Sequence, residues 1–162
     1  MIPNKWDIAH MKVAETYASL SSAERMKVGA ILVKQNRIIS IGYNGMPSGW
    51  DNTCEEPAHN VVGVRKDGND IVEIYLKTKP EVLHAEANAI TKVARSNESS
   101  EGSTLYTTVS PCMECAKMIY QSGVKKVWFK DEYRDKSGID FLIKCNVEVF
   151  KYVDPNETNV TL

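Results

Sequence analysis

The stretch STLYTTVSPCMECAKMIYQSGVKKVWFK, residues 103–130, decides the fold because it alternates strand and helix patterns. Residues 103–110 and 124–130 are predicted to be strands. Residues 111–123 between them are predicted to be a helix, with proline at the first position and glycine at the end. Strands that are joined through a crossover helix run parallel. The stretch therefore predicts an α/β layer with a parallel pair of strands.

The flanking sequence extends this alternation in both directions. Further helices are predicted at 4–20, 84–96 and 137–146, and further strands at 28–33, 37–43 and 147–153. A tight turn separates the first two strands, which predicts an antiparallel hairpin, whereas the later strands follow crossover helices and should pair in parallel. With 162 residues, we expect one domain over 1–162 with a partly parallel sheet.

Two segments fall outside this alternation. Residues 44–80 begin with a Gly-, Pro- and Asn-rich loop, and 54–80 have no clear periodicity, although 70–77 (DIVEIYLK) fit a short helix or a strand. We therefore expect a long functional loop such as a lid. Residues 154–162 form a polar tail of the kind that is often disordered.

Composition limits the possible classes of protein. The net charge of -1 lacks the basic footprint of a nucleic-acid binder, although a small phosphorylated substrate needs only two or three cations. The N-terminal residues lack the apolar middle region of a signal peptide, and no apolar run approaches the roughly 20 residues that span a bilayer. We expect a cytoplasmic protein whose partners are neither nucleic acid nor membrane.

Four cysteines in a reducing compartment indicate metal binding or catalysis more than disulfides. Cys112 and Cys115 lie on one face at a predicted helix start, where free N–H groups and the helix dipole favour the thiolate that binds zinc. His84 opens another predicted helix. If both helices begin at one sheet edge, three ligands meet and leave a fourth corner for water, as in a catalytic zinc site. The competing interpretations are two core cysteines and a capping or packed histidine.

Glu86 lies two residues after His84, so the two side chains do not share a helical face and Glu86 is not expected to be a fourth ligand. Zinc lowers the pKa of a bound water from 15.7 to about 7. A carboxylate beside it can take that proton, leaving zinc-bound hydroxide, and later return the proton to the substrate. The alternative is a glutamate that merely favours the helix dipole.

These residues resemble a known family. His84-Ala85-Glu86 followed by Pro111-Cys112-Met113-Glu114-Cys115 is similar to the H-x-E…P-C-x-x-C signature of zinc-dependent cytidine and deoxycytidylate deaminases. The segments KVGAILVKQNRIISIGYNGMPSG and EYRDKSGIDFLIKCNVEVF extend the likeness to deoxycytidylate (dCMP) deaminases, including phage-encoded forms, over about residues 5–153. The resemblance implies a cytidine-deaminase-like three-layer fold with a mixed five-stranded sheet flanked by helices.

The resemblance also implies a reaction: dCMP and water give dUMP and ammonia, which supplies dUMP for thymidylate synthesis. Zinc is the implied cofactor, Glu86 the proton shuttle, and His84, Cys112 and Cys115 the ligands. For a phage-encoded member the location is the host cytoplasm.

The resemblance implies substrate contacts as well. Asn44 in the GYNG loop would contact the sugar, and the Ala85 N–H and Ser110 carbonyl would hold the base edge. The candidates for the 5′-phosphate are Arg25, Lys27, Tyr133 and Arg134, each of which could equally be a solvated loop residue. The two arginines rank above the lysine because the guanidinium fork suits phosphate.

Members of this family are often hexamers that dCTP activates and dTTP inhibits, each with Mg²⁺. The implied effector site lies near the GYNG loop, and its candidate residues are Gly42, Tyr43, Gly45 and Asp51. Some relatives carry a second, structural zinc, but Cys54 and His59 are too few ligands for a closed site here. Cys145 lies in an apolar stretch and is expected in the core.

Two other functions stay open. A deaminase of tRNA adenosine would use the same zinc chemistry but needs a basic channel for flanking nucleotides. A non-enzymatic zinc module would close its site with four Cys or His ligands, and this sequence offers three convincing ones beside a glutamate.

Overall fold

The computed structural model describes residues 1–66 and 68–155 of the chain. Its main sheet has the strand order β2-β1-β5-β6-β7. These strands are β1 (Gly29–Lys34), β2 (Arg37–Tyr43), β5 (Thr104–Val109), β6 (Lys126–Asp131) and β7 (Glu148–Lys151). The helices are α1 (Lys5–Ala18), α2 (Ala85–Ala94), α3 (Met113–Gln121) and α4 (Ser137–Lys144). The predicted tail beyond 155 lies outside the described residues.

The sheet is mixed, as predicted. β1 pairs antiparallel with β2 through a two-residue turn at Gln35 and Asn36, whose φ angles of 50° and 59° suit a hairpin turn. The pairs β5–β6 and β6–β7 are parallel because α3 and α4 cross between their strands. β5 also pairs antiparallel with β1, which joins the hairpin to the parallel half.

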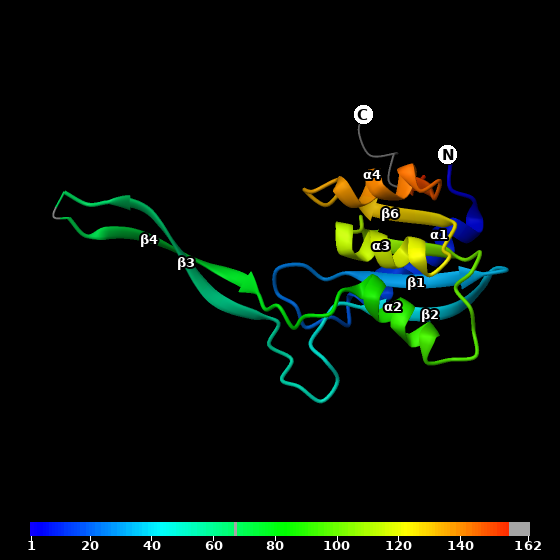
Figure 1. Cartoon of the computed structure of the whole chain (residues 1–162), viewed down its shortest axis with the longest axis horizontal. Helices are drawn as coiled ribbons and strands as arrows, with labels where there is room; N and C mark the ends of the chain where they lie inside the picture. The colour runs from blue at the N-terminus through cyan, green and yellow to red at the C-terminus, as the bar shows by residue number, and fades with distance from the viewer. Residues whose placement is uncertain (67, 156–162) are drawn as a thin grey trace.

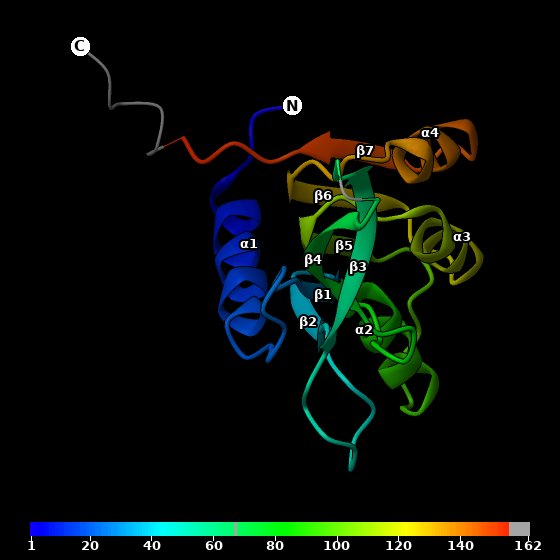
Figure 2. The ribbon, with the colours of Figure 1, turned by 90° about the vertical axis from the view of Figure 1, so that its left-hand side faces the viewer.

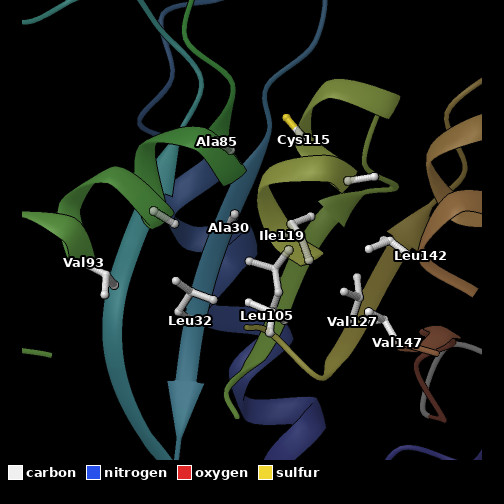
Figure 3. Close-up of a cluster of buried hydrophobic side chains, with 13 residues drawn as sticks. Ala30, Leu32, Ala85, Val93, Leu105, Cys115, Ile119, Val127, Leu142 and Val147 are labelled. Carbon is white, nitrogen blue, oxygen red and sulfur yellow. The ribbon is translucent and has the colours of Figure 1, made fainter. Parts of the chain in front are cut away.

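Helices cover both faces of the sheet and give three layers (Figure 2). α1 packs on one face, and α2, α3 and α4 pack on the other. β1 shows why both faces are buried. Ala30 and Leu32 point into the core under α2 and α3 (Figure 3), whereas Ile31 and Val33 belong to the buried cluster that contains residues of α1. A nearly continuous apolar run is what a strand buried on both faces requires.

The first helix is held at its start by a capping box and by a bond to the sheet. Asn4 caps α1: its side chain accepts from the Asp7 N–H, and the Asp7 carboxylate accepts from the Asn4 N–H. The same carboxylate accepts a 2.7 Å hydrogen bond from the buried Tyr106 hydroxyl of β5. Burial and this bond raise the pKa of Tyr106 well above its usual value. α1 is thereby tied to the sheet.

The expectation of a long loop over 44–80 is wrong for residues 55–78, whereas the strand that 70–77 were said to fit is confirmed. Residues there form an antiparallel hairpin of β3 (Glu55–Val64) and β4 (Asp70–Thr78), a two-stranded sheet of its own. We call β3 and β4 together the arm, and Figure 1 shows it projecting away from the main sheet.

The observed ends of two helices also differ from the predicted ends. α1 ends at Ala18, and α3 begins at Met113, so that Pro111 precedes the cap residue Cys112 instead of opening the helix. Cys145 packs partly buried against the core under α4, as expected. Among the described residues, no helix combines the length and apolar character needed to cross a membrane.

Candidate active site

Two helices begin side by side at one edge of the sheet, and each begins with a candidate metal ligand. His84 is the N-cap of α2 and Cys112 the N-cap of α3. Neither side chain caps its own helix, so the interpretation of His84 as a simple cap does not hold. Cys115 lies in the first turn of α3 and faces the start of α2 near Ala85 (Figure 3).

The three candidate ligands converge on one point. The His84 Nδ1 atom lies 3.6 Å from the Cys112 Sγ and 3.4 Å from the Cys115 Sγ, and the three ligand atoms lie within 4.8 Å of one another. Zinc bonds of about 2.3 Å to sulfur and 2.0 Å to nitrogen place tetrahedral ligand atoms about 3.5–3.8 Å apart. The histidine and two thiols therefore fit a zinc ion in both chemistry and spacing.

The protonation equilibria of the three candidate ligands are coupled, and only the pKa of Cys112 shifts toward the form that binds metal. Hydrogen bonds to Cys115 and then to His84 lower the pKa of Cys112 to about 3. The pKa of Cys115 is raised, first by its hydrogen bond to Cys112 and then by burial. The hydrogen bond to Cys112 also raises the pKa of His84. The cluster thus already holds one thiolate, the protonation state that zinc binds.

Glu86 lies beside these ligands in the first turn of α2 and is only 4 % exposed. Burial raises the pKa of its carboxyl group. Glu86 lines the same cavity as His84 and Cys112. A buried carboxyl with a raised pKa next to a metal site is suited to take up and release a proton near neutral pH.

The cavity also brings together most of the residues predicted to bind substrate. Asn44, Ala85, Ser110, Arg25 and Tyr133 all line it. Lys27 and Arg134 do not line it: Lys27 is exposed, and the Arg134 guanidinium lies 5.9 Å from the centre of the Tyr133 ring. The structure therefore separates the four phosphate candidates into two inside the cavity and two outside it.

Asn44 organises one wall of the cavity. Its side-chain oxygen accepts from the Val28 N–H at 2.8 Å, and its amide donates to the Met26 carbonyl at 2.8 Å. Met26 and Val28 line the cavity themselves. The amide group carries a second N–H, so Asn44 can hold this wall and still donate to a ligand.

Among the cavity residues that the sequence reasoning missed, two are polar: Glu55 and Thr78 at the base of the arm. They pair with each other across β3 and β4. The buried Glu55 carboxylate accepts from the backbone N–H groups of Glu24 at 3.2 Å and Arg25 at 3.3 Å. The Arg25 guanidinium donates to the Thr78 hydroxyl at 3.2 Å. The base of the arm therefore holds Arg25 at the cavity.

Three of the four predicted effector residues lie at α2 or at the segment just before it, and the fourth lies apart. Gly42 lies so close to α2 that a Cβ there would stand 2.1 Å from the Ala85 carbonyl oxygen. The Tyr43 carbonyl accepts from the Asn88 side chain of α2, and Gly45 exchanges backbone hydrogen bonds with Leu83. Asp51 lies apart and exposed, and its carboxylate accepts from Thr53.

The three-layer fold and the His, Cys, Cys and Glu cluster define a hydrolytic zinc site on an α/β scaffold. Residues 4–131 match the family described as the cytidine and deoxycytidylate deaminase zinc-binding region. The chain belongs to this family of zinc-dependent hydrolytic deaminases.

Individual relatives support this assignment. The deoxycytidylate deaminase of Enterobacteria phage T4 is 34% identical over 90% of this chain and 89% of its own. The human deoxycytidylate deaminase is 39% identical over 81% of this chain and 68% of its own. The crystal structure of dCMP deaminase from cyanophage S-TIM5 with dCMP and dUMP is 45% identical and superposes with a TM-score of 0.78, over 94% of this chain and all of the other.

Proposed function

We propose that this chain, as a single domain, hydrolyses dCMP to dUMP and ammonia. The observation that carries the proposal is the convergence of His84, Cys112 and Cys115 on one point, at a cavity that the buried Glu86 also lines. Support for the substrate comes from the phage, human and cyanophage relatives, which are named for dCMP. The natural role is to supply dUMP for thymidylate synthesis, in the cytoplasm or in the host cytoplasm of a phage.

Zinc bound by His84 Nδ1 and the two cysteine sulfurs would supply the Lewis acidity that makes a water molecule nucleophilic near neutral pH. Glu86 does the proton work. Its carboxylate accepts the two protons of the water one after the other, and its raised pKa lets it return the first to N3 of the ring and the second to the leaving amine. One buried residue is thereby general base and then general acid.

The remaining cavity residues orient the nucleotide. Ala85 is the first residue of α2, so its N–H has no acceptor within the helix and can donate to the base edge, opposite the Ser110 carbonyl. The spare Asn44 N–H is placed for the sugar. Arg25 and Tyr133 hold the 5′-phosphate, and Lys27 and Arg134 are secondary candidates because they lie outside the cavity.

We infer regulation and assembly from the family resemblance. In this proposal the chain forms a homo-hexamer that Mg-dCTP activates and Mg-dTTP inhibits. An effector near Gly42, Tyr43 and Gly45 would act through α2, because Gly42 and Tyr43 contact that helix and Gly45 bonds to Leu83, just before its cap residue. Asp51 would contribute only as an exposed contact of the effector itself.

Glu86→Gln tests the chemistry. The variant is expected to lose about 10²- to 10⁴-fold in kcat while it keeps its fold and its zinc, because only the proton transfer is removed. Ammonia release from dCMP is the assay, and metal content and circular dichroism are measured in parallel. Glu81→Gln, an exposed carboxylate just before the site, is the control and should retain full activity. Full activity in Glu86→Gln would refute the mechanism.

A substrate panel tests the specificity. The purified protein is incubated with dCMP, deoxycytidine, CMP and a tRNA stem-loop that contains adenosine, with and without Mg-dCTP or Mg-dTTP. Fast turnover of dCMP alone, altered by the triphosphates, is the expected result. Turnover of the stem-loop with dCMP inert would replace the proposed substrate by a nucleic acid and keep the metal chemistry.

A further inference from the structure

The arm presents an apolar face that nothing in the described chain covers. Its two strands contact each other and little else, and Figure 1 shows them extending away from the body. Side chains alternate between the two faces of a strand, so Val72, Ile74 and Leu76 of β4 share one face. They are 47%, 78% and 40% exposed. The other face of β4 is mixed: it carries the charged Glu73 and Lys77 together with Ile71 and Tyr75, which are 42% and 39% exposed.

A hairpin of this kind is incomplete as a structure. An isolated two-stranded hairpin is only marginally stable in water, and a third or fourth strand is needed for independent stability. A contiguous exposed apolar surface marks an interaction site, and Val72, Ile74 and Leu76 form such a surface here. Along the two outer edges of the arm, backbone N–H and C=O groups that point away from the hairpin can pair with a further strand.

The two edges are not equivalent, and the proline in β3 shows why. Pro57 lies opposite Leu76 in the arm. Proline has no N–H, so this pair cannot exchange hydrogen bonds, and the N–H and C=O of Leu76 must point outward from β3. The same parity points the backbone groups of Ile74 and Val72 outward. β3 has Pro57 on its own outer edge and a register shift between Val61 and Gly63, and both features discourage further pairing there.

The open edge of β4 is complementary to itself. Ile74 is the central residue of the nine in β4, so antiparallel pairing of β4 with a second β4 about a two-fold axis places Ile74 opposite Ile74. Val72 then lies opposite Leu76, and these are the residues whose backbone groups point outward. On the reverse face Glu73 lies opposite Tyr75, and Lys77 lies opposite Ile71. In this register no charge faces a like charge directly.

We propose that the arm is a docking element for a second copy of this chain, and that the two copies pair through their β4 edges in this register. The product is a four-stranded antiparallel ribbon with the order β3-β4-β4-β3, in which the apolar faces of both arms form one surface. A two-fold contact of this kind presents the same patch from both copies, as symmetric dimers do. The proposal does not depend on the enzyme's substrate, because its test measures mass.

Charge swaps at Ile74 test the contact. Ile74→Lys alone and Ile74→Glu alone each place like charges at the two-fold axis, and each is expected to run at half the mass of the wild-type assembly, with a dissociation constant raised at least tenfold. An equimolar mixture is expected to recover the wild-type mass, because lysine then faces glutamate. Masses are measured by light scattering or sedimentation at micromolar concentration, against 18.2 kDa for one chain.

His59 provides the matched control. It lies opposite Ile74 on the same face of the arm, but on the β3 edge. His59→Lys and His59→Glu add the same charges, and each is expected to leave the mass unchanged. Ile74→Pro and His59→Pro make the same comparison for backbone hydrogen bonds, because each removes an outward N–H without breaking a bond between β3 and β4. Only Ile74→Pro is expected to halve the mass.

Three outcomes would overturn the proposal. The first is a wild-type mass equal to one chain. The second is an unchanged mass for the Ile74 charge variants, and the third is failure of the lysine and glutamate variants to recover the wild-type mass on mixing. Circular dichroism of every variant separates loss of the contact from loss of the fold, and the mixing result requires both variants to be folded.

Discussion

The start of α4 lies against the backbone of Pro111 and Cys112, and Cys112 is a candidate metal ligand. The substitution Gly138→Ala tests this contact. A Cβ on Gly138 would lie 2.1 Å from the Pro111 carbonyl oxygen and 2.8 Å from the Cys112 carbonyl carbon, whereas ordinary contacts begin near 3.4 Å. The obstructing atoms are backbone, so either α4 or the Pro111–Cys112 segment must move by more than 1 Å. The added methyl group therefore displaces the residue that begins α3.

The expected loss follows from that displacement. Overpacking a closely packed interior by a methyl group reduces the free energy of unfolding by about 1–3 kcal/mol. For a chain of this size the corresponding fall in Tm is about 2–4 °C per kcal/mol, so roughly 2–12 °C. Displacing the neighbourhood of a metal ligand typically weakens metal affinity by about 10- to 100-fold. We expect both changes in Gly138→Ala.

Thermal unfolding with and without added zinc, together with competition against a zinc chelator, measures both quantities. Gly45→Ala is the control, because a Cβ there would meet nothing within 4 Å, and it should match the wild type. If Gly138→Ala has the Tm and the zinc affinity of the wild type, the close approach of α4 to Cys112 is wrong. If only the Tm falls, the contact is structural and does not position the ligand.

Two further predictions concern titrating groups. Burial and the bond to Asp7 raise the pKa of Tyr106 above that of an unfolded tyrosine, so its contribution is complete below about pH 10 and is lost as the pH rises further. The free energy of unfolding should therefore fall more steeply between pH 9.5 and 11 in the wild type than in Tyr106→Phe; equal slopes would contradict this. After zinc is removed by a chelator, iodoacetamide at pH 7 should modify Cys112 before Cys115. The pKa of Cys112 is about 3 whereas that of Cys115 is raised, and of the two thiols only Cys112 is partly exposed. Mass spectrometry of peptides measures the order of alkylation. Zinc added back should suppress the alkylation, and reaction of Cys115 first would contradict the prediction.

Much of the body of the fold could be predicted because its signals are local. The apolar run at 28–33, the turn after it and the helix between 103–110 and 124–130 are each visible in consecutive residues. The candidate metal site was equally accessible, because two helix starts follow from local patterns and bring His84 and Cys112 to one sheet edge.

The arm was missed for a physical reason. Its side chains are nearly all exposed, so burial imposes no regular pattern on β3, which also contains Pro57. One local signal was present: an Asp-Gly dipeptide at 67–68 separates two runs rich in valine and isoleucine, a combination typical of hairpins. The role of Glu55 had no such signal, since it depends on the backbone of residues 24 and 25, thirty positions earlier.

The phosphate candidates show a similar limit. Sequence ranked Arg134 with Arg25 because both are arginines in loops, and residue type alone does not say which loop faces the cavity. Arg25 is directed there by Glu55 and Thr78, which belong to another part of the chain. Arg134 instead lies by the ring of its neighbour Tyr133.

The separation of the candidate ligands along the chain has a consequence for folding. His84 and Cys112 are 28 residues apart, and the intervening chain includes all of α2 and β5. A metal held by both residues is a cross-link that closes this loop, and the chain-entropy relation used for disulfides gives roughly 3–4 kcal/mol for a loop of that length. A bound metal would then stabilise the fold as well as take part in the chemistry. Loss of the metal would weaken the packing of α2 against α3 even with every catalytic residue intact.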